Sequence, residues 1–178
     1  MSRPRAGSRK GMEPTTKFDS RFSDPEASAT PWADAEAVLI AAELYWLTTV
    51  RADGRPHVTP LIGLYHDGAM HFVTGTEEQK ARNLEHARKV ALTTGANTWN
   101  AGLDVVVEGD AVRITDTAKL QELADAIEAK YGEVWHFDVA GDAFGGQGST
   151  PGLVFRVEPA KVLAFAKAPH GHTSFRFG

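Results

Sequence analysis

The sequence predicts a mainly β protein of about six antiparallel strands with flanking helices. Two Asp-Gly pairs, Asp53-Gly54 and Asp67-Gly68, separate short apolar runs, which is the strongest short-range signal for a β-hairpin. Helical spacing of apolar residues is clearest over 120–127. A chain of 178 residues with 42% apolar composition suits one domain with a substantial core.

Composition excludes several classes of function. The 19 basic and 23 acidic residues leave a formal charge of −4, so no electrostatic footprint for nucleic acid or an anionic membrane is expected. The chain has no cysteine, which excludes a disulfide framework, a thiol nucleophile and a cysteine metal site. No apolar run of about 20 residues could span a membrane. We expect a cytoplasmic protein without a secretory signal.

The N-terminal segment 1–30 is rich in Ser, Pro, Gly and charged residues, which is typical of a mobile arm. The domain proper is therefore expected over residues 31–178. Thr30 and Pro31 occupy the preferred N-cap and first positions of a helix. The predicted buried side of that helix consists of Ala37, Leu39, Ile40 and Leu44.

The stretch from 45 to 84 predicts a strand-rich unit ending in an anion cradle. Strands are expected at 45–51, 56–65 and 69–74, and Gly75 allows the chain to turn. Thr76 and Gln79 have the spacing of a capping box that opens a helix. Unpaired N–H groups at such a helix start favour a phosphate, with Lys80 and Arg82 as nearby cations. The alternative is an ordinary capped surface helix.

The second half of the chain continues the pattern of strands with one clear helix. A strand over 90–94 precedes a loop, 95–102, that carries Trp99 and Asn100. Further expected elements are a long bent strand or hairpin at 103–115, a helix from Asp116 or Thr117 with an apolar stripe at Leu120, Leu123, Ala124 and Ile127, and strands at 153–157 and 162–166 joined by 158–161. The glycine-rich segment 132–152 is predicted to be a loose lid, and 170–177 an exposed tail.

Motifs for other chemistry are missing from the sequence. It contains no G-x-S-x-G, no P-loop and no G-x-G-x-x-G after a strand, which argues against hydrolase, kinase and Rossmann functions. His170 and His172 lack an acidic partner at fixed spacing, so no metal site is expected. Among the scattered histidines, His57 lies nearest the expected chemistry because it precedes Val58-Thr59-Pro60; a solvent-facing position is its simpler interpretation.

The order of these parts resembles the pyridoxamine 5′-phosphate oxidase-like superfamily, the split β-barrel flavin and deazaflavin oxidoreductases. The features that carry the resemblance are, in order, a strand, a D-G-R-P turn, a V-T-P-L strand, a D-G turn, an F-V-T-G-T strand and a K-x-R-N-L helix. The resemblance covers Trp32 to Phe177. It implies a split β-barrel of the FMN-binding type, a homodimer with the cofactor at the subunit interface, and FMN, or alternatively coenzyme F420, as cofactor.

The resemblance also implies roles for individual residues. The strand Val58-Thr59-Pro60-Leu61 would run along the flavin ring, and Thr74, Gly75 and Thr76 would lie beneath the ribityl-phosphate arm. Lys80 matches the phosphate lysine of the family, and Arg82-Asn83 begins its R-N-L signature. Trp99 and Asn100, with the C-terminal tail, would come from the partner subunit to close the site.

Two departures argue against oxidation of pyridoxamine phosphate itself. Asp104 and Val106 stand where the vitamin oxidase has a flavin-contacting Gln and Arg, and 173–177 lacks its R-L-x-P ending. No side chain is assigned a catalytic role, since a bound cofactor would supply the reactive centre. We therefore expect an oxidoreductase acting on another small organic molecule. The alternative is a non-catalytic cofactor carrier or a haem-binding module with His66 or His71 as axial ligand.

Overall fold

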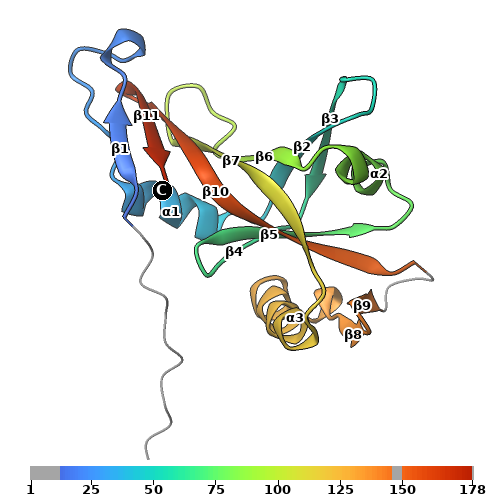
Figure 1. The fold of residues 1–178 in the computed structure, drawn as a ribbon. Coiled ribbons are helices and arrows are strands. Elements are labelled where there is room, and N and C mark those ends of the chain that lie inside the picture. Colours follow the sequence, from blue (N-terminus) through green and yellow to red (C-terminus); the bar gives the residue numbers. More distant parts are fainter. Residues whose placement is uncertain (1–12, 146–149, 178) are drawn as a thin grey trace, which may run out of the picture.

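The computed structural model describes residues 13–145 and 150–177, and it confirms a mainly β fold (Figure 1). Its strands are β1 Thr15–Phe18, β2 Tyr45–Val50, β3 Pro56–Leu61, β4 Leu64–His66, β5 Ala69–Gly75, β6 Lys89–Thr94, β7 Leu103–Ile114, β8 Asp138–Ala140, β9 Ala143–Gly145, β10 Gly152–Lys167 and β11 His170–Arg176. Its helices are α1 Trp32–Ala41, α2 Gln79–His86 and α3 Thr117–Tyr131, with short 3₁₀ turns at Ser20–Phe22 and Glu133–Trp135. The eleven strands exceed the expected number of about six. No described helix has the length and apolar character needed to cross a membrane.

The strands form one antiparallel sheet that curls into a barrel around β10 (Figure 1). The main path is β1-β11-β10-β7-β6-β2-β3. On the β10 edge opposite β7, β11 pairs with the second half of the strand and β5 with the first half, and β4 lies beside β5. β10 is one strand of 16 residues, so the two separate strands predicted there were wrong. Its register against β7 shifts between Pro159 and Lys161. Such a bulge bends a strand without ending it, which explains how β10 serves both halves of the barrel.

β7 is the long bent strand of the two alternatives predicted for 103–115, and Gly109 lies where it faces the β10 bulge. A Cβ atom at Gly109 would lie 2.3 Å from the Glu158 carbonyl oxygen and 2.8 Å from Val157 Cγ1. At this point the backbones of β7 and β10 are too close for any residue other than glycine at position 109.

Gly109→Ala is expected to destabilise the fold by about 1–3 kcal/mol, the usual cost of overpacking. The free energy of unfolding from urea titration provides the measurement. Gly171→Ala is the matched control, since its Cβ would meet its nearest neighbour at an ordinary 3.5 Å. Equal stability of the two variants would contradict the account of the bend.

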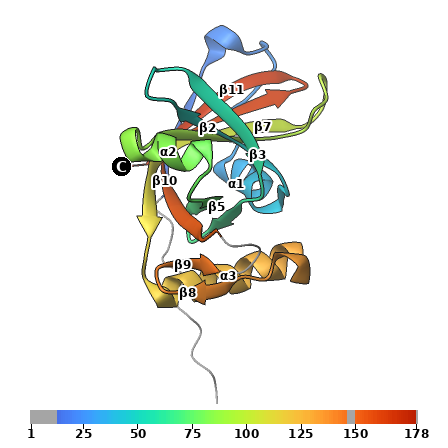
Figure 2. The same cartoon turned by 90° about the vertical axis from the view of Figure 1, so that its right-hand side faces the viewer.

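Two apolar clusters hold the molecule together. The barrel interior contains Tyr45, Leu47, Phe72, Leu92, Val105, Val107, Val157, Val162 and Phe175, among others. The second cluster lies between the sheet and α3, which Figure 2 shows with β8 and β9 as a layer beneath the barrel. All four residues of the predicted apolar stripe on α3 are buried there, and Asp116 caps the helix by accepting from the Lys119 backbone N–H at 2.8 Å.

Helix α1 differs from its prediction at both its start and its buried side. Pro31 rather than Thr30 is the N-cap. Ala35 and Leu39 are the buried residues, whereas Ala37, Ile40 and Leu44 are exposed. Trp32, Val38 and Ala42 pack against the same cluster. The side that faces the barrel therefore follows these positions, and positions 37 and 40 fall on the opposite side of the helix.

The two ends of the described chain pair with each other. β1 runs antiparallel to β11, with Lys17 opposite Ser174. The predicted tail 170–177 is therefore largely a strand, and the arm predicted over 1–30 is held on the sheet at 15–18; its first 12 residues lie outside the described residues. This pairing was missed because its partners lie more than 150 residues apart in sequence.

The segment predicted as a loose lid has secondary structure of its own. After the 3₁₀ turn at Glu133–Trp135, β8 and β9 form a hairpin, and Phe144 of β9 pairs with Gly152 of β10. Phe137 stacks on Phe144 with ring centroids 4.9 Å apart. Residues 146–149 of this segment lie outside the described residues.

Candidate functional site

The predicted cradle forms where β5 ends and α2 begins. The backbone N–H of Gly75 donates to Glu78 Oε1 at 2.7 Å, and the Lys80 ammonium forms an ion pair with Glu78 Oε2. Lys80 is only 7% exposed, which is unusual for a lysine unless it is paired. Burial raises the pKa of Glu78, the Lys80 ammonium and the Gly75 N–H lower it, and the net pKa lies below its usual value. These donors already hold an anion, and it is the protein's own carboxylate.

The capping box predicted for α2 was wrong. The helix begins at Gln79 with Glu78 as N-cap, and no side chain caps it. Thr76 is exposed in the preceding turn, and the Gln79 amide donates to Asn83 Oδ1 at 2.8 Å instead of reaching back. Glu78 has an extended backbone, which delays the helix by two residues. The first N–H groups of α2 therefore remain available beside the cradle.

Arg82 and Asn83, predicted together as cofactor-binding residues, occupy different environments. Arg82 is exposed on α2. Asn83 is 2% exposed and donates to Thr49 Oγ1 of β2 at 2.8 Å. Thr49 Oγ1 lies 3.5 Å from His57 Nδ1 of β3. Asn83 thus connects α2, through β2, to the strand predicted to carry the flavin ring.

Asn83→Ala is expected to lower stability by about 1–2 kcal/mol, because Thr49 and Gln79 lose a buried partner. Chemical denaturation measures this, with Arg82→Ala as the exposed control, for which a change within about 0.5 kcal/mol is expected. A stability loss for Arg82→Ala as large as that for Asn83→Ala would contradict the assignment.

β3 contains the predicted segment 58–61 and pairs with β2 alone among the described strands. An edge strand leaves one row of backbone N–H and C=O groups without a strand partner. Val58 and Pro60 are exposed, and Leu61 is half-buried. The Thr59 hydroxyl oxygen is buried with no hydrogen-bond partner among the described residues. An accessible backbone edge therefore lies along the segment that the resemblance places beside a flavin ring.

Thr74 and Gly75 end β5 at the cradle, whereas Trp99 and Asn100 do not approach it within one chain. The loop 95–102 follows the end of β6, whereas α2 precedes its start, and a strand of six residues spans about 20 Å. Figure 1 shows the loop and α2 well apart. Trp99 is 94% exposed. Lys167 anchors the loop through the Thr98 carbonyl oxygen at 2.7 Å.

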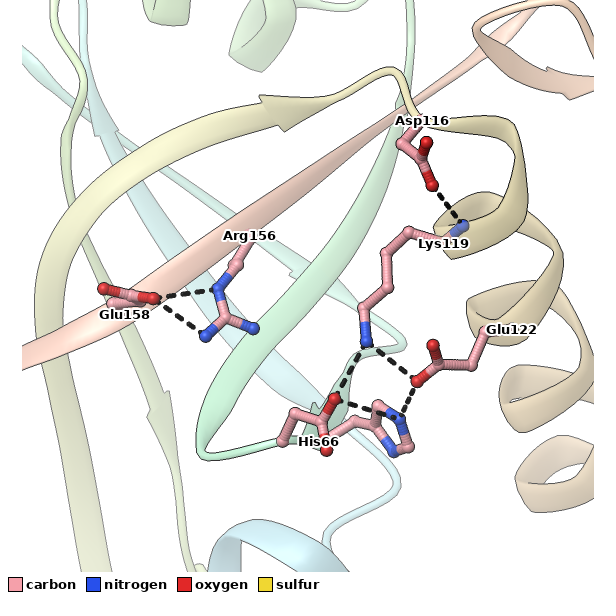
Figure 3. A network of polar contacts seen from close by, with 7 residues as sticks. His66, Asp116, Lys119, Glu122, Arg156 and Glu158 are labelled. Carbon is pink, nitrogen blue, oxygen red and sulfur yellow. Dashed lines mark hydrogen bonds and ion pairs between the residues drawn. The ribbon is translucent and has the colours of Figure 1, made fainter. Parts of the chain in front are cut away.

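His66 belongs to a polar cluster that fastens α3 to the β4–β5 turn (Figure 3). His66 Nε2 lies 2.6 Å from Glu122 Oε1, and Lys119 Nζ lies 2.8 Å from Glu122 and 2.9 Å from Asp67. Donor atoms of His66, Asp67 and Glu122 lie within 4.8 Å of one another. The Lys119 ammonium already stands between the two carboxylates where a metal ion would bind. We interpret the cluster as a structural latch.

The two histidines proposed for haem are both engaged in the fold. The Nε2 atom of His66 is held by Glu122. His71 lies on β5 with its ring against that of His66, is 1% exposed, and has two buried nitrogens without a hydrogen-bond partner in the described ranges. A haem iron could reach His71 only after a rearrangement that exposes its ring, so the arrangement of these residues does not favour haem.

A shallow groove lies on the opposite side of the barrel from α2. Its lining includes Lys17, Lys161, Phe165, His172 and Arg176, from β1, β10 and β11. None of the predicted cofactor residues lines it. The cradle, which holds an anion on a buried cation, is therefore the candidate anion-binding site.

The antiparallel sheet curled around β10, with its flanking helices, places the chain in the class of split β-barrel proteins. The family model described as pyridoxamine 5′-phosphate oxidase matches residues 32–166. The chain therefore belongs to the pyridoxamine 5′-phosphate oxidase family. No significant match exists among curated proteins.

Solved structures share the fold at low sequence identity. A FAD-binding protein from Mesorhizobium loti is 18% identical with a TM-score of 0.57, over 83% of this chain and 96% of that one. An F420 reductase is 20% identical with a TM-score of 0.54, over 71% and 94%. A haem storage protein from Vibrio cholerae is 19% identical with a TM-score of 0.56, over 76% and 91%. One fold thus accompanies three different cofactors in these proteins.

Glu78 is the site residue that sequence reasoning missed. An acidic residue three positions after Gly75 and two before Lys80 was the available signal. It was overlooked because the helix was expected to begin two residues earlier, which would have placed Glu78 inside the first turn and away from Gly75.

Proposed function

We propose that this chain is a flavin- or deazaflavin-dependent oxidoreductase that acts on a small organic molecule other than pyridoxamine phosphate. The single observation that carries the proposal is the anion held by Gly75 and the buried Lys80 at the start of α2. A phosphate on the cofactor is the natural ligand for such donors. FMN is the proposed cofactor, with coenzyme F420 as the alternative.

The residues around the cradle fit a cofactor of this kind. The Gly75 N–H and Lys80 would hold the phosphate, with Thr74 and Thr76 beside the arm that carries it. The free backbone edge of 58–61 would meet the polar edge of the ring, and a bound ligand would supply the partner that the Thr59 hydroxyl lacks. The ring, when bound, accepts or donates an electron pair. The protein positions it and excludes water.

The departures from the vitamin oxidase have structural counterparts. Asp104, which replaces the flavin-contacting Gln, forms an ion pair with Lys167 at 3.0 Å. Lys167 also donates to the Thr98 carbonyl oxygen, so the pair helps to anchor the Trp99 loop. The absence of the vitamin oxidase's Gln at this position is one reason to propose a substrate other than pyridoxamine phosphate.

A second copy of the chain is proposed to complete the site. Trp46 is 48% exposed and Val58 51% exposed. Trp46 lies opposite Pro60, and Val58 opposite Thr48, so these apolar side chains share one face of the β2–β3 pair. The Trp99 loop, remote from the cradle of its own chain, would reach that of the partner. Two-fold pairing is the commonest arrangement that supplies such a contact.

Light scattering at micromolar concentration is expected to give twice the chain mass of 19.2 kDa. Trp99→Ala should weaken cofactor affinity if the partner's loop closes the site, whereas Trp135→Ala, in the α3 layer, should not. A clean monomer that binds the cofactor with full affinity would contradict the two-chain site.

An absorption spectrum of the protein as purified tests the cofactor. A two-banded yellow spectrum indicates FMN, and a single blue-shifted band indicates the deazaflavin. A colourless preparation is titrated with each cofactor in turn, and micromolar binding followed by bleaching on reduction and reoxidation by an added acceptor is the expected result. A Soret band would overturn the proposal. Tight binding without any acceptor among quinones, tetrapyrroles and oxygen would favour a non-catalytic carrier.

A further inference from the structure

Glu78 uses both carboxylate oxygens on the donors that the cofactor phosphate needs. Oε1 accepts from the Gly75 N–H at 2.7 Å, and Oε2 is paired with the Lys80 ammonium. The approach to Gly75 is close, since a Cβ atom there would lie 3.2 Å from Oε1. The single Gly75 N–H can serve one anion at a time, and a phosphate on the Lys80 ammonium would be repelled by a carboxylate held beside it. Phosphate binding therefore requires Glu78 to leave.

The two partners differ in their freedom to move. The Lys80 side chain is 9% exposed, whereas that of Glu78 is 50% exposed. Glu78 can rotate into water at little cost, while Lys80 is enclosed on the first turn of α2. A buried ammonium that loses its partner is costly, so Lys80 retains an anion at all times. Either the carboxylate or an incoming phosphate can meet that need.

We propose that Glu78 is an internal competitor for the cofactor phosphate, which keeps the empty cradle neutral and makes the bound cofactor exchangeable. This inference rests on the proposed function and adds a specific role for a residue in its site. The carboxylate returns to Gly75 and Lys80 as the phosphate departs, so it lowers affinity chiefly by promoting release.

The test compares ligands with and without the phosphate. Glu78→Gln is expected to tighten FMN binding about 5- to 10-fold, the worth of one partly exposed charged contact, and to slow FMN dissociation to a similar extent. Riboflavin, which lacks the phosphate, should bind the wild type and the variant equally. Fluorescence titration and stopped-flow dissociation measure both quantities without recourse to activity. Coenzyme F420 and its phosphate-free deazaflavin nucleoside form a second ligand pair.

Three further variants sharpen the experiment. Glu77→Gln makes the same charge change at the neighbouring exposed position, and it should leave FMN affinity unchanged. Glu78→Ala should act like Glu78→Gln, with unfolding midpoints confirming that both fold. In a Lys80→Met background the gain from Glu78→Gln should shrink, because only the competition for the Gly75 N–H remains.

The outcomes separate this inference from the proposed function. If Lys80→Met weakens phosphate-bearing ligands while Glu78→Gln leaves them unchanged or weaker, the competitor role is overturned and the cofactor site stands. If no flavin or deazaflavin binds any variant, Glu78→Gln included, both are overturned. An equal gain for riboflavin would also overturn the inference, since the effect would not involve the phosphate.

Discussion

Replacing Lys80 by alanine is expected to weaken FMN binding about 10- to 150-fold, the loss of a charge-assisted contact of about 1.5–3 kcal/mol. Lys80 is the buried cation of the cradle, and no other described side chain contributes a positive charge to Glu78 at hydrogen-bond distance. Riboflavin affinity should change little. Titration of flavin fluorescence gives both constants.

Two variants control this experiment. Lys80→Met retains the buried aliphatic stem and removes only the charge, so it separates lost packing from lost electrostatics. Lys89→Ala removes a lysine that is 91% exposed and 3.7 Å from Asp110, and it should leave affinity unchanged. Unchanged affinity in all three variants would mean that α2 is an ordinary surface helix and that the cofactor site lies elsewhere.

The stability of the protein is expected to fall by roughly 3 kcal/mol between pH 6.5 and pH 4 because of His71. Burial, and then the nearby charges of Arg156 and His66, lower the pKa of His71 from 6.5 to about 4. Lys119 on α3 acts in the same direction, and the Leu64 backbone opposes it. In this range His71 binds a proton in the unfolded chain but not in the folded chain. The contribution of the neutral His71 to the free energy of unfolding is therefore complete above pH 6.5 and is lost as the pH falls towards 4.

His71→Leu should flatten the stability curve over this window, which urea unfolding at a series of pH values would reveal. The difference between wild type and variant is the readout. The exposed His136 acts with the opposite sign, because Glu128 and Asp138 raise its pKa. An unchanged slope in the variant would show that His71 is protonated in the folded protein.

The local features of the fold were predictable because they depend on neighbours in sequence. The Asp67-Gly68 hairpin forms as expected, with positive φ angles of 50° and 69° at the two residues, a backbone that Asp and Gly tolerate better than most residues. The apolar stripe of α3 is buried as expected. Both conformations depend on residues that are only a few positions apart in the sequence.

The continuity of β10 could not be predicted from neighbouring residues in this way. Pro159 and Ala160 looked like a turn between two strands, but β10 continues through them because β7 follows its bend at Gly109. The pairing of β1 with β11 joins residues near opposite ends of the chain. Such pairings are decided by which strand edges remain unpaired once the barrel has formed, and no local pattern records that.

The sequence by itself determined the family, the hairpins and the position of Gly75 and Lys80 in one anion-holding turn, since those residues are close in the chain and their chemistry is local. Only the tertiary structure decided that Asn83 is a buried tie to β2 and that Trp99 is remote from its own cradle. It also placed the Glu78 carboxylate on the Gly75 N–H and the Lys80 ammonium, the donors proposed for the phosphate. The physical reason is that these roles depend on burial and side-chain direction, which are set by elements folded from distant parts of the chain.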